Sequence, residues 1–230
     1  MTGTAGAPFL VALNLTRRCN LKCAHCYLDA GTLDRGDPDE LATPEVRTLL
    51  DEIAALSEET MVVLTGGEPL LRPDIMEIAA HASGLGLMVV VGTNGVLLTG
   101  KRVAALQKAG VSAVGISVDS LDAGHHDGFR GAPGSWAKTI SGIDACRCAG
   151  LMFQVHFSVT DGNAHELESM IEFCRSSGAA VLNVFFLVCT GRGETYTNIS
   201  LETYEDVLRR VARAARDEKQ LLVRARCAPH

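Results

Sequence analysis

Residues 61–95 read MVVLTGGEPLLRPDIMEIAAHASGLGLMVVVGTNG and contain a predicted strand, helix and second strand. Residues 61–64 and 87–91 are short, continuously apolar runs, which are typical of strands buried on both faces of a parallel sheet. Residues 73–83 between them have the apolar period of a helix. Two such strands joined by a helix form a right-handed βαβ unit.

The same alternation continues on both sides of this unit. Further strands are predicted at residues 10–15, 113–118, 152–159 and 181–188. Further helices are predicted at residues 43–56, 97–109, 135–149, 163–176 and 201–217. A closed eight-stranded barrel typically needs about 250 residues, so six strand–helix units predict an α/β fold with a partial barrel or an open parallel sheet.

Composition excludes several classes of protein. The chain has 230 residues, is 47% hydrophobic and carries a formal net charge of −6, and it lacks a dense basic stripe for nucleic acid. Its longest apolar runs, such as residues 181–188, are far shorter than the ~20 residues that span a membrane. Because the first residues also do not resemble a signal peptide, we expect a cytoplasmic protein with no membrane or nucleic-acid partner.

Three of the eight cysteines lie in one loop after the first predicted strand. Cys19, Cys23 and Cys26 have the spacing C-x3-C-x2-C, and soft thiolates suit iron–sulfur chemistry. A fully ligated [4Fe–4S] cluster needs four protein ligands, so three cysteines leave one iron open. The alternative is a zinc site that uses these cysteines with or without His25, although the spacing is unusual for zinc.

Polar residues and glycines follow the carboxyl ends of five predicted strands, the edge where parallel α/β folds bind ligands. Turn formation explains the glycines, but it explains the cysteines, Glu68, Asn94 and Asp119 less well. The segments are the cysteine loop, Gly66-Gly67-Glu68-Pro69, Gly92-Thr93-Asn94-Gly95, Ser117-Val118-Asp119 and Thr190-Gly191-Arg192-Gly193.

At these segments the sequence resembles the radical S-adenosylmethionine (SAM) superfamily, in particular its SPASM/twitch subgroup. The resemblance implies a partial (β/α)6 TIM-like barrel with parallel strands and a [4Fe–4S] cluster on Cys19, Cys23 and Cys26. SAM would chelate the fourth iron through its amino and carboxylate groups. Reductive cleavage of SAM would give a 5′-deoxyadenosyl radical that abstracts hydrogen from the substrate, with electrons from a flavodoxin- or ferredoxin-type donor.

The resemblance also implies which residues contact SAM around the cluster. Glu68, together with the backbone of Gly66 and Gly67, would receive the SAM ammonium group as a charge-assisted pair. Glycines at this turn would let the backbone approach the cofactor, although an ordinary strand-to-helix turn also favours them. The His25 ring and backbone would flank the adenine.

Four further positions complete the implied SAM site. Ser117 matches a SAM-contacting serine of related peptide-modifying and sulfatase-maturing enzymes. Asp119 and Asn94 would bind the ribose or shape the site. Arg130 resembles an arginine that pairs with the SAM carboxylate, and a solvated surface arginine is the alternative.

The other cysteines divide into two groups. Cys146, Cys148 and Cys174 lie on predicted helices, and we expect them to pack in the core as small apolar residues. Cys189 ends the sixth predicted strand and is expected at the rim of the site.

Cys227 lies near the end of the chain, in a passage that we interpret as strand-to-loop. The resemblance implies residues 1–220 as the radical SAM core and residues 221–230 as the start of a C-terminal extension that is otherwise absent. Cys227 would then be an auxiliary-cluster ligand of a longer protein.

Residues 185–193 and the Cys-Ala-Pro-His ending resemble enzymes that modify the propionate side chains of haem precursors. Arg192 would then pair with a substrate carboxylate. Two alternatives remain open: a maturase of a ribosomally made peptide or protein, and a non-catalytic iron–sulfur or zinc module.

Overall fold

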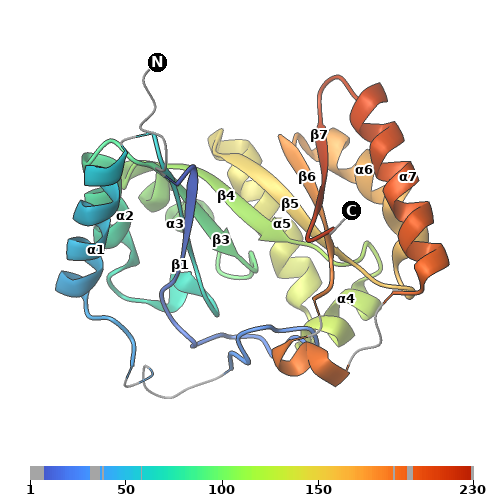
Figure 1. Ribbon diagram of the computed structural model, residues 1–230, viewed down its shortest axis with the longest axis horizontal. Coiled ribbons are helices and arrows are strands. Elements are labelled where there is room, and N and C mark those ends of the chain that lie inside the picture. The colour runs from blue at the N-terminus through green and yellow to red at the C-terminus, as the bar shows by residue number, and fades with distance from the viewer. Residues whose placement is uncertain are drawn as a thin grey trace.

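The described part of the chain is built around one parallel β-sheet (Figure 1). The computed structural model describes residues 8–31, 37, 39–57, 59–188, 190–195 and 199–228. Seven strands lie in sequential order, and each pairs in parallel with its neighbours. The strands are β1 (Leu10–Asn14), β2 (Met61–Thr65), β3 (Met88–Thr93), β4 (Val111–Ser117), β5 (Met152–Val159), β6 (Val181–Phe186) and β7 (Leu222–Arg226). The predicted α/β partial barrel is confirmed, with one more strand than the six expected.

Helices follow the strands in regular alternation. They are α1 (Thr43–Leu56), α2 (Ile75–Gly84), α3 (Gly100–Lys108), α4 (Ala123–Arg130), α5 (Ser135–Ala149), α6 (Leu167–Ser177) and α7 (Leu201–Asp217). Three 3₁₀ turns are η1 (Pro69–Leu71), η2 (Ala164–Glu166) and η3 (Gly191–Thr195). The structure confirms the predicted bounds of α1, α5, α7 and β5. No helix in the described part of the chain combines the length and apolarity needed to cross a membrane.

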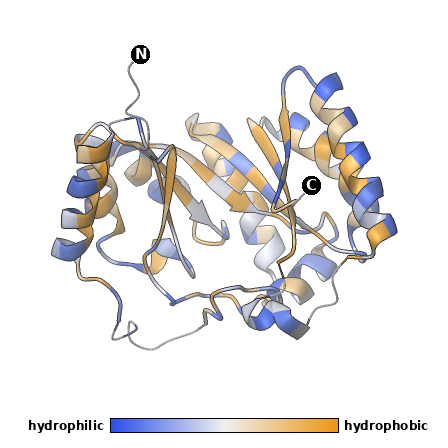
Figure 2. Ribbon diagram, in the orientation of Figure 1, coloured by the Kyte–Doolittle hydropathy of each residue, from blue (hydrophilic) through white to orange (hydrophobic). Residues whose placement is uncertain are grey.

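The two faces of the sheet differ in character. Alternate strand residues such as Val62, Val114 and Leu182 are fully buried in the core that the helices cover. The opposite face is apolar in β2 and β3, as predicted for buried parallel strands, but it carries polar side chains in β5 and β6, including His156 and Asn183. Figure 2 shows the apolar colouring of the central strands and the mixed colouring of the surrounding helices. The polar residues thus lie on the concave side, away from the helices.

Helix α4 departs from the sequence prediction, whereas strand β7 lies in the passage interpreted as strand-to-loop. Helix α4 is not predicted from the sequence, because two glycines interrupt it. It begins after the N-cap Asp122, whose side chain accepts from His125 N, and it ends at Gly131, which has a left-handed backbone conformation. Strand β7 lies in residues that were predicted to begin an extension. It pairs with β6 from Val181–Leu222 onward, so these residues continue the core sheet.

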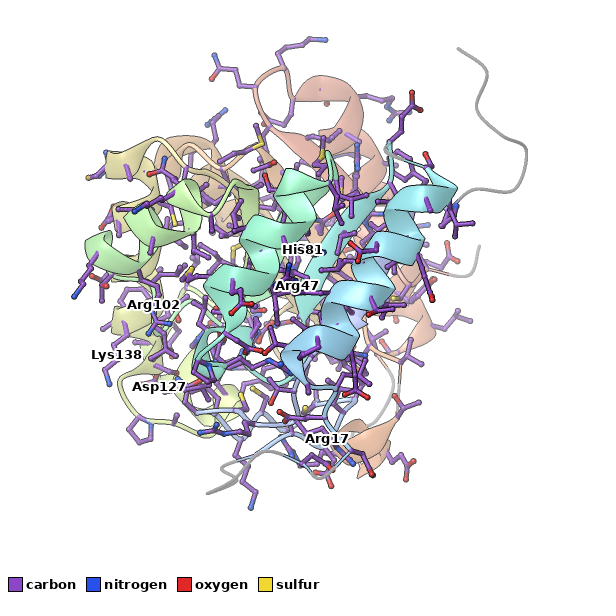
Figure 3. The ribbon with its side chains drawn as sticks, turned by 90° about the vertical axis from the view of Figure 1, so that its left-hand side faces the viewer. Arg17, Arg47, His81, Arg102, Asp127 and Lys138 are labelled. Carbon is purple, nitrogen blue, oxygen red and sulfur yellow. The ribbon has the colours of Figure 1, made fainter. Side chains whose placement is uncertain are left out.

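Two arginines and one histidine connect the first strand–helix units through hydrogen bonds and ion pairs. The buried Arg72 donates to Leu15 O at 2.8 Å, to Leu41 O and to the carboxylate of Asp74, so the end of β1 is tied to the start of α2. Arg47 of α1 and His81 of α2 lie between these two helices (Figure 3). These contacts fix the position from which the cysteine loop starts.

Candidate active site

The cysteine loop leaves β1 and runs across the carboxyl ends of the strands toward α4 and η3 (Figure 1). Cys19 and Cys23 are buried with Leu21 and Ala30 in a small apolar cluster of their own, and Cys26 is half-buried beside them. The structure thus brings all three predicted cluster ligands to the carboxyl edge of the sheet.

Each of the three sulfur atoms accepts a hydrogen bond from a nearby N–H group. Such contacts to thiolates stabilise metal-bound sulfur and tune the potential of an iron–sulfur cluster. The contacts are Leu21 N to Cys19 Sγ at 3.4 Å, Ala30 N to Cys26 Sγ at 3.4 Å and Arg130 Nη1 to Cys23 Sγ at 3.7 Å. This donor set fits a cluster held on the three sulfurs.

A single-ion site fits the geometry less well. Within the described ranges, no set of three or more His, Cys, Asp or Glu side chains converges on one point. In a cubane each cysteine binds a different iron, so the sulfurs need not meet at one point. Burial raises the pKa of Cys19 to about 11, so the thiol is protonated until a metal displaces the proton.

The turn after β2 holds the beginning of the cysteine loop. Gly67 N donates to Thr16 O at 2.7 Å, and Glu68 N donates to Arg18 O at 2.8 Å. A Cβ at Gly66, whose φ is +134°, would lie 2.5 Å from Thr16 O, and one at Gly67 would lie 2.3 Å from Arg18 O. The two glycines therefore permit close backbone packing against the loop, and their contact with SAM stays a prediction.

Glu68 is fully buried beneath the turn. Its carboxylate accepts from Thr93 Oγ1 at 2.8 Å, from Asn94 N at 2.8 Å and from Leu70 N at 3.1 Å. Burial raises the pKa of Glu68, and no ion pair to it is formed within the described residues. The charge of Arg102 partly opposes this rise in the pKa, and the buried carboxylate is suited to a cationic group of a ligand. Here it also joins the ends of β2 and β3 through its hydrogen bonds.

Asn94 lies between the end of β3 and the cysteine loop. Its Nδ2 donates to Asn20 Oδ1 at 2.9 Å and lies 3.9 Å from Cys19 Sγ, while its carbonyl accepts from Thr139. Asn94 thus connects the end of β3 to the cysteine loop, and its role toward the ribose or in shaping the site stays a prediction.

Asp119 and Arg130 form a buried ion pair at the end of β4, with Arg130 Nη2 2.5 Å from Asp119 Oδ2. Arg130 is therefore not the solvated surface residue that the sequence left open. Its Nε has no hydrogen-bond partner among the described residues. Ser117 is half-buried two residues before Asp119. The pair places a cation beside Cys23, next to the cluster site and suited to an anionic group of the cofactor.

His25 stacks on Phe129 of α4, with the ring centroids 4.3 Å apart and the planes 9° from parallel. Burial lowers the pKa of His25 to about 4, so the imidazole is neutral. Phe129 was not singled out in the sequence, although it directly precedes Arg130. A flat, neutral, stacked ring of this kind is suited to packing against a purine.

Arg192, predicted to pair with a substrate carboxylate, braces the cysteine loop. Its Nε donates to Cys23 O at 2.9 Å, and its Nη1 contacts Asp29 Oδ1 at 2.6 Å and Ala30 O at 2.7 Å. The guanidinium is thus committed to the protein, because the segment after β6 folds back beneath the loop.

The remaining cysteines have different surroundings. Cys146 and Cys174 are buried as predicted, but Cys148 is exposed, since two residues along a helix turn a side chain to the opposite face. Cys227 is exposed just after β7 with a φ of +55°, and its role as an auxiliary-cluster ligand stays a prediction. Cys189 lies outside the described residues.

A parallel half-barrel with three cysteine sulfurs and buried charges at the carboxyl edge of its strands is the arrangement of an iron–sulfur enzyme core. The Radical SAM superfamily matches residues 13–174, and the chain belongs to this family. Membership implies a [4Fe–4S] cluster and SAM as cofactors.

Relatives and solved structures agree with this assignment. The chain is 39% identical to the AdoMet-dependent heme synthase of Methanosarcina barkeri over 100% of this chain and 65% of the relative. It is 32% identical to the Fe-coproporphyrin III synthase of the same organism over 85% of this chain and 48% of the relative. The structure of Streptococcus suis SuiB bound to S-adenosylmethionine matches with a TM-score of 0.80 at 18% identity, over 95% of this chain and 50% of that chain. The chain thus spans less than two thirds of the length of these proteins.

Proposed function

We propose that this chain is the catalytic core of an enzyme that reductively cleaves SAM and removes hydrogen from a propionate side chain of a haem precursor. The observation that carries the SAM chemistry is the set of three cysteine sulfurs, each with an N–H donor, at the carboxyl edge of the half-barrel. The cluster, when bound, supplies the electron that cleaves the sulfonium.

The residues of the chain would bind and orient the cofactors. Cys19, Cys23 and Cys26 would hold the cluster, and the ring of His25 would pack against the adenine. Arg130 would attract the SAM carboxylate from its place beside Cys23. Glu68 would attract the SAM ammonium, because its buried carboxylate accepts hydrogen bonds from Thr93, Asn94 and Leu70 but forms no ion pair among the described residues.

The substrate assignment is supported by the relatives. Proteins named AdoMet-dependent heme synthase match this chain along its whole length, at 39% identity in one case. The second candidate is peptide maturation, which is favoured by 35% identity to a PqqA peptide cyclase of Rhodopseudomonas palustris over 79% of this chain. The flavodoxin- or ferredoxin-type electron donor stays an expectation.

Anaerobic reconstitution with iron and sulfide, followed by reductant and SAM, tests the cofactor chemistry. We expect the broad visible absorption of an iron–sulfur cluster and formation of 5′-deoxyadenosine. Cys23→Ala should abolish the product because the cluster loses one of its three ligands, whereas the exposed Cys148→Ala should behave as wild type. Product formation by Cys23→Ala at the wild-type rate would refute the ligand assignment.

A further inference from the structure

The concave face of the sheet carries an uneven distribution of charge. The strand residues that face away from the helices can be identified from the alternating burial and from the register of the seven strands. Within the described strands this face contains two arginines, Arg224 and Arg226 of β7, and no Asp or Glu. The face is therefore cationic along β7.

Arg226 is held in place by a chain of amide side chains. Its Nε donates to Asn183 Oδ1 of β6 at 3.0 Å, and Asn183 Nδ2 donates to Gln154 Oε1 of β5 at 2.9 Å. Asn183 is only 2% exposed, whereas Arg226 is exposed. The amide side chains of Gln154 and Asn183 thus orient the exposed guanidinium of Arg226, and this hydrogen-bonded chain connects β5, β6 and β7.

The guanidinium of Arg226 has capacity for an anion. Arg192 is paired with Asp29 on the cysteine loop, but no ion pair to Arg226 is formed within the described part of the chain. Only its Nε is engaged there, which leaves the two terminal nitrogens as donors for a planar, bidentate acceptor. Such an acceptor is a carboxylate.

The surroundings of Arg226 are suited to a flat, apolar body that bears this carboxylate. Its register partner Phe185 lies 5.2 Å, between ring centroids, from the ring of His156. Gly115 gives this ring its space, since a Cβ at 115 would approach the imidazole to 2.6 Å. Burial, with added repulsion from the Arg226 charge, lowers the pKa of His156 to about 4, so the floor of the face is neutral.

Arg226 is the last residue of β7, which runs parallel to the other strands, so it lies at the carboxyl edge of the sheet, where the cysteine loop leaves β1. We propose that Arg226, positioned by Asn183 and Gln154, binds a propionate carboxylate of the tetrapyrrole substrate. This inference rests on the proposed function, and it assigns to Arg226 the contact that the sequence assigned to Arg192.

Binding of Fe-coproporphyrin III to the reconstituted chain in the presence of SAM, followed by tryptophan-fluorescence quenching, tests the inference. Arg226→Gln should weaken binding by roughly tenfold or more, as expected for loss of a charge-assisted pair. Arg226→Lys, which keeps the charge but loses the planar fork, should recover part of the affinity. Arg209→Gln, an exposed arginine on the outer helix α7, is the matched control and should bind as wild type.

Two further measurements separate the outcomes. The visible absorption of the cluster and uncoupled formation of 5′-deoxyadenosine should be the same in Arg226→Gln and wild type, which shows an intact core. Coproporphyrin III with its propionates esterified should bind wild type and Arg226→Gln equally. Equal affinity of wild type and Arg226→Gln for Fe-coproporphyrin III with free propionates would overturn the role of Arg226 and leave the proposed function unaffected. A wild-type protein that cleaves SAM but binds no tetrapyrrole would overturn the proposed substrate, and the inference with it.

Discussion

Asp119 and Arg130 show how one pair of residues controls the charge beside the cluster site. Asp119 is fully buried and Arg130 is nearly so, and Asp119 Oδ1 also accepts from Ser158 N at 3.0 Å. Burial is the largest effect and disfavours the charged carboxylate, but the Arg130 guanidinium and the smaller contributions that include the Ser158 hydrogen bond together hold the pKa of Asp119 below its ordinary value. Removing one partner of such a pair leaves an uncompensated buried charge.

Asp119→Asn should therefore reduce the free energy of unfolding by about 3–5 kcal/mol, because it strands the Arg130 cation in the interior. Urea unfolding of the reduced chain, followed by circular dichroism, measures the change. The double variant Asp119→Asn/Arg130→Gln should lose less than the single variant, since no charge remains unpaired. A single variant as stable as wild type would show that the pair is not coupled in solution.

At the scale of elements, the turn between β2 and η1 is the part that joins the sheet to the cysteine loop. Two backbone hydrogen bonds connect Gly67 and Glu68 to Thr16 and Arg18, at separations that exclude a side chain at position 67. The turn therefore acts on the site through packing, in addition to any contact with the cofactor.

Gly67→Ala should displace the loop, because its Cβ would lie 2.3 Å from Arg18 O and 3.1 Å from Ala30 Cβ. We expect a loss of about 1–3 kcal/mol in stability and a lower iron content after reconstitution. Gly84→Ala, at the end of α2 with no heavy atom within 4 Å of the added Cβ, is the control and should change stability by no more than about 1 kcal/mol. Wild-type iron binding by Gly67→Ala would contradict this role.

For the whole molecule, buried histidines couple folding to pH. Burial lowers the pKa of His126 and of His156 to about 4, from an ordinary value of 6.5. The folded protein thus keeps both imidazoles neutral where the unfolded chain protonates them. Stability is at its full value above pH 6.5 and is lost as the pH falls toward 4, because unfolding takes up protons in this window.

The free energy of unfolding should fall by about 1.4 kcal/mol per pH unit for each imidazole that titrates in this window. Urea unfolding of the metal-free, reduced chain between pH 7 and pH 4.5 measures the slope. His156→Gln should reduce the slope by about one proton, and the exposed His165→Gln should leave it unchanged. A stability that does not vary between pH 7 and pH 5 would show that neither histidine is buried in solution.

Features that depend on neighbouring residues could be predicted from the sequence, whereas contacts between distant residues could not. The end of α5 follows from Gly150, and the bounds of β5 follow from its apolar run, and both signals act within a few residues. The prediction that Cys148 is buried was wrong. The helical period was enough to correct it, because two cysteines that are two residues apart cannot both face the core from one helix. The strand β7 was only partly foreseen, since its pairing with β6 joins residues about 40 apart.

The alternation of strands and helices and the motif of Cys19, Cys23 and Cys26 can be recognised without a structure, because they are patterns of neighbouring residues. The pairing of charges becomes visible only in the folded chain. Arg192 forms an ion pair with Asp29, and Arg130 forms one with Asp119. Arg226 instead donates a hydrogen bond to the amide side chain of Asn183. These choices depend on how distant strand ends pack at one edge of the sheet, and no local pattern encodes them.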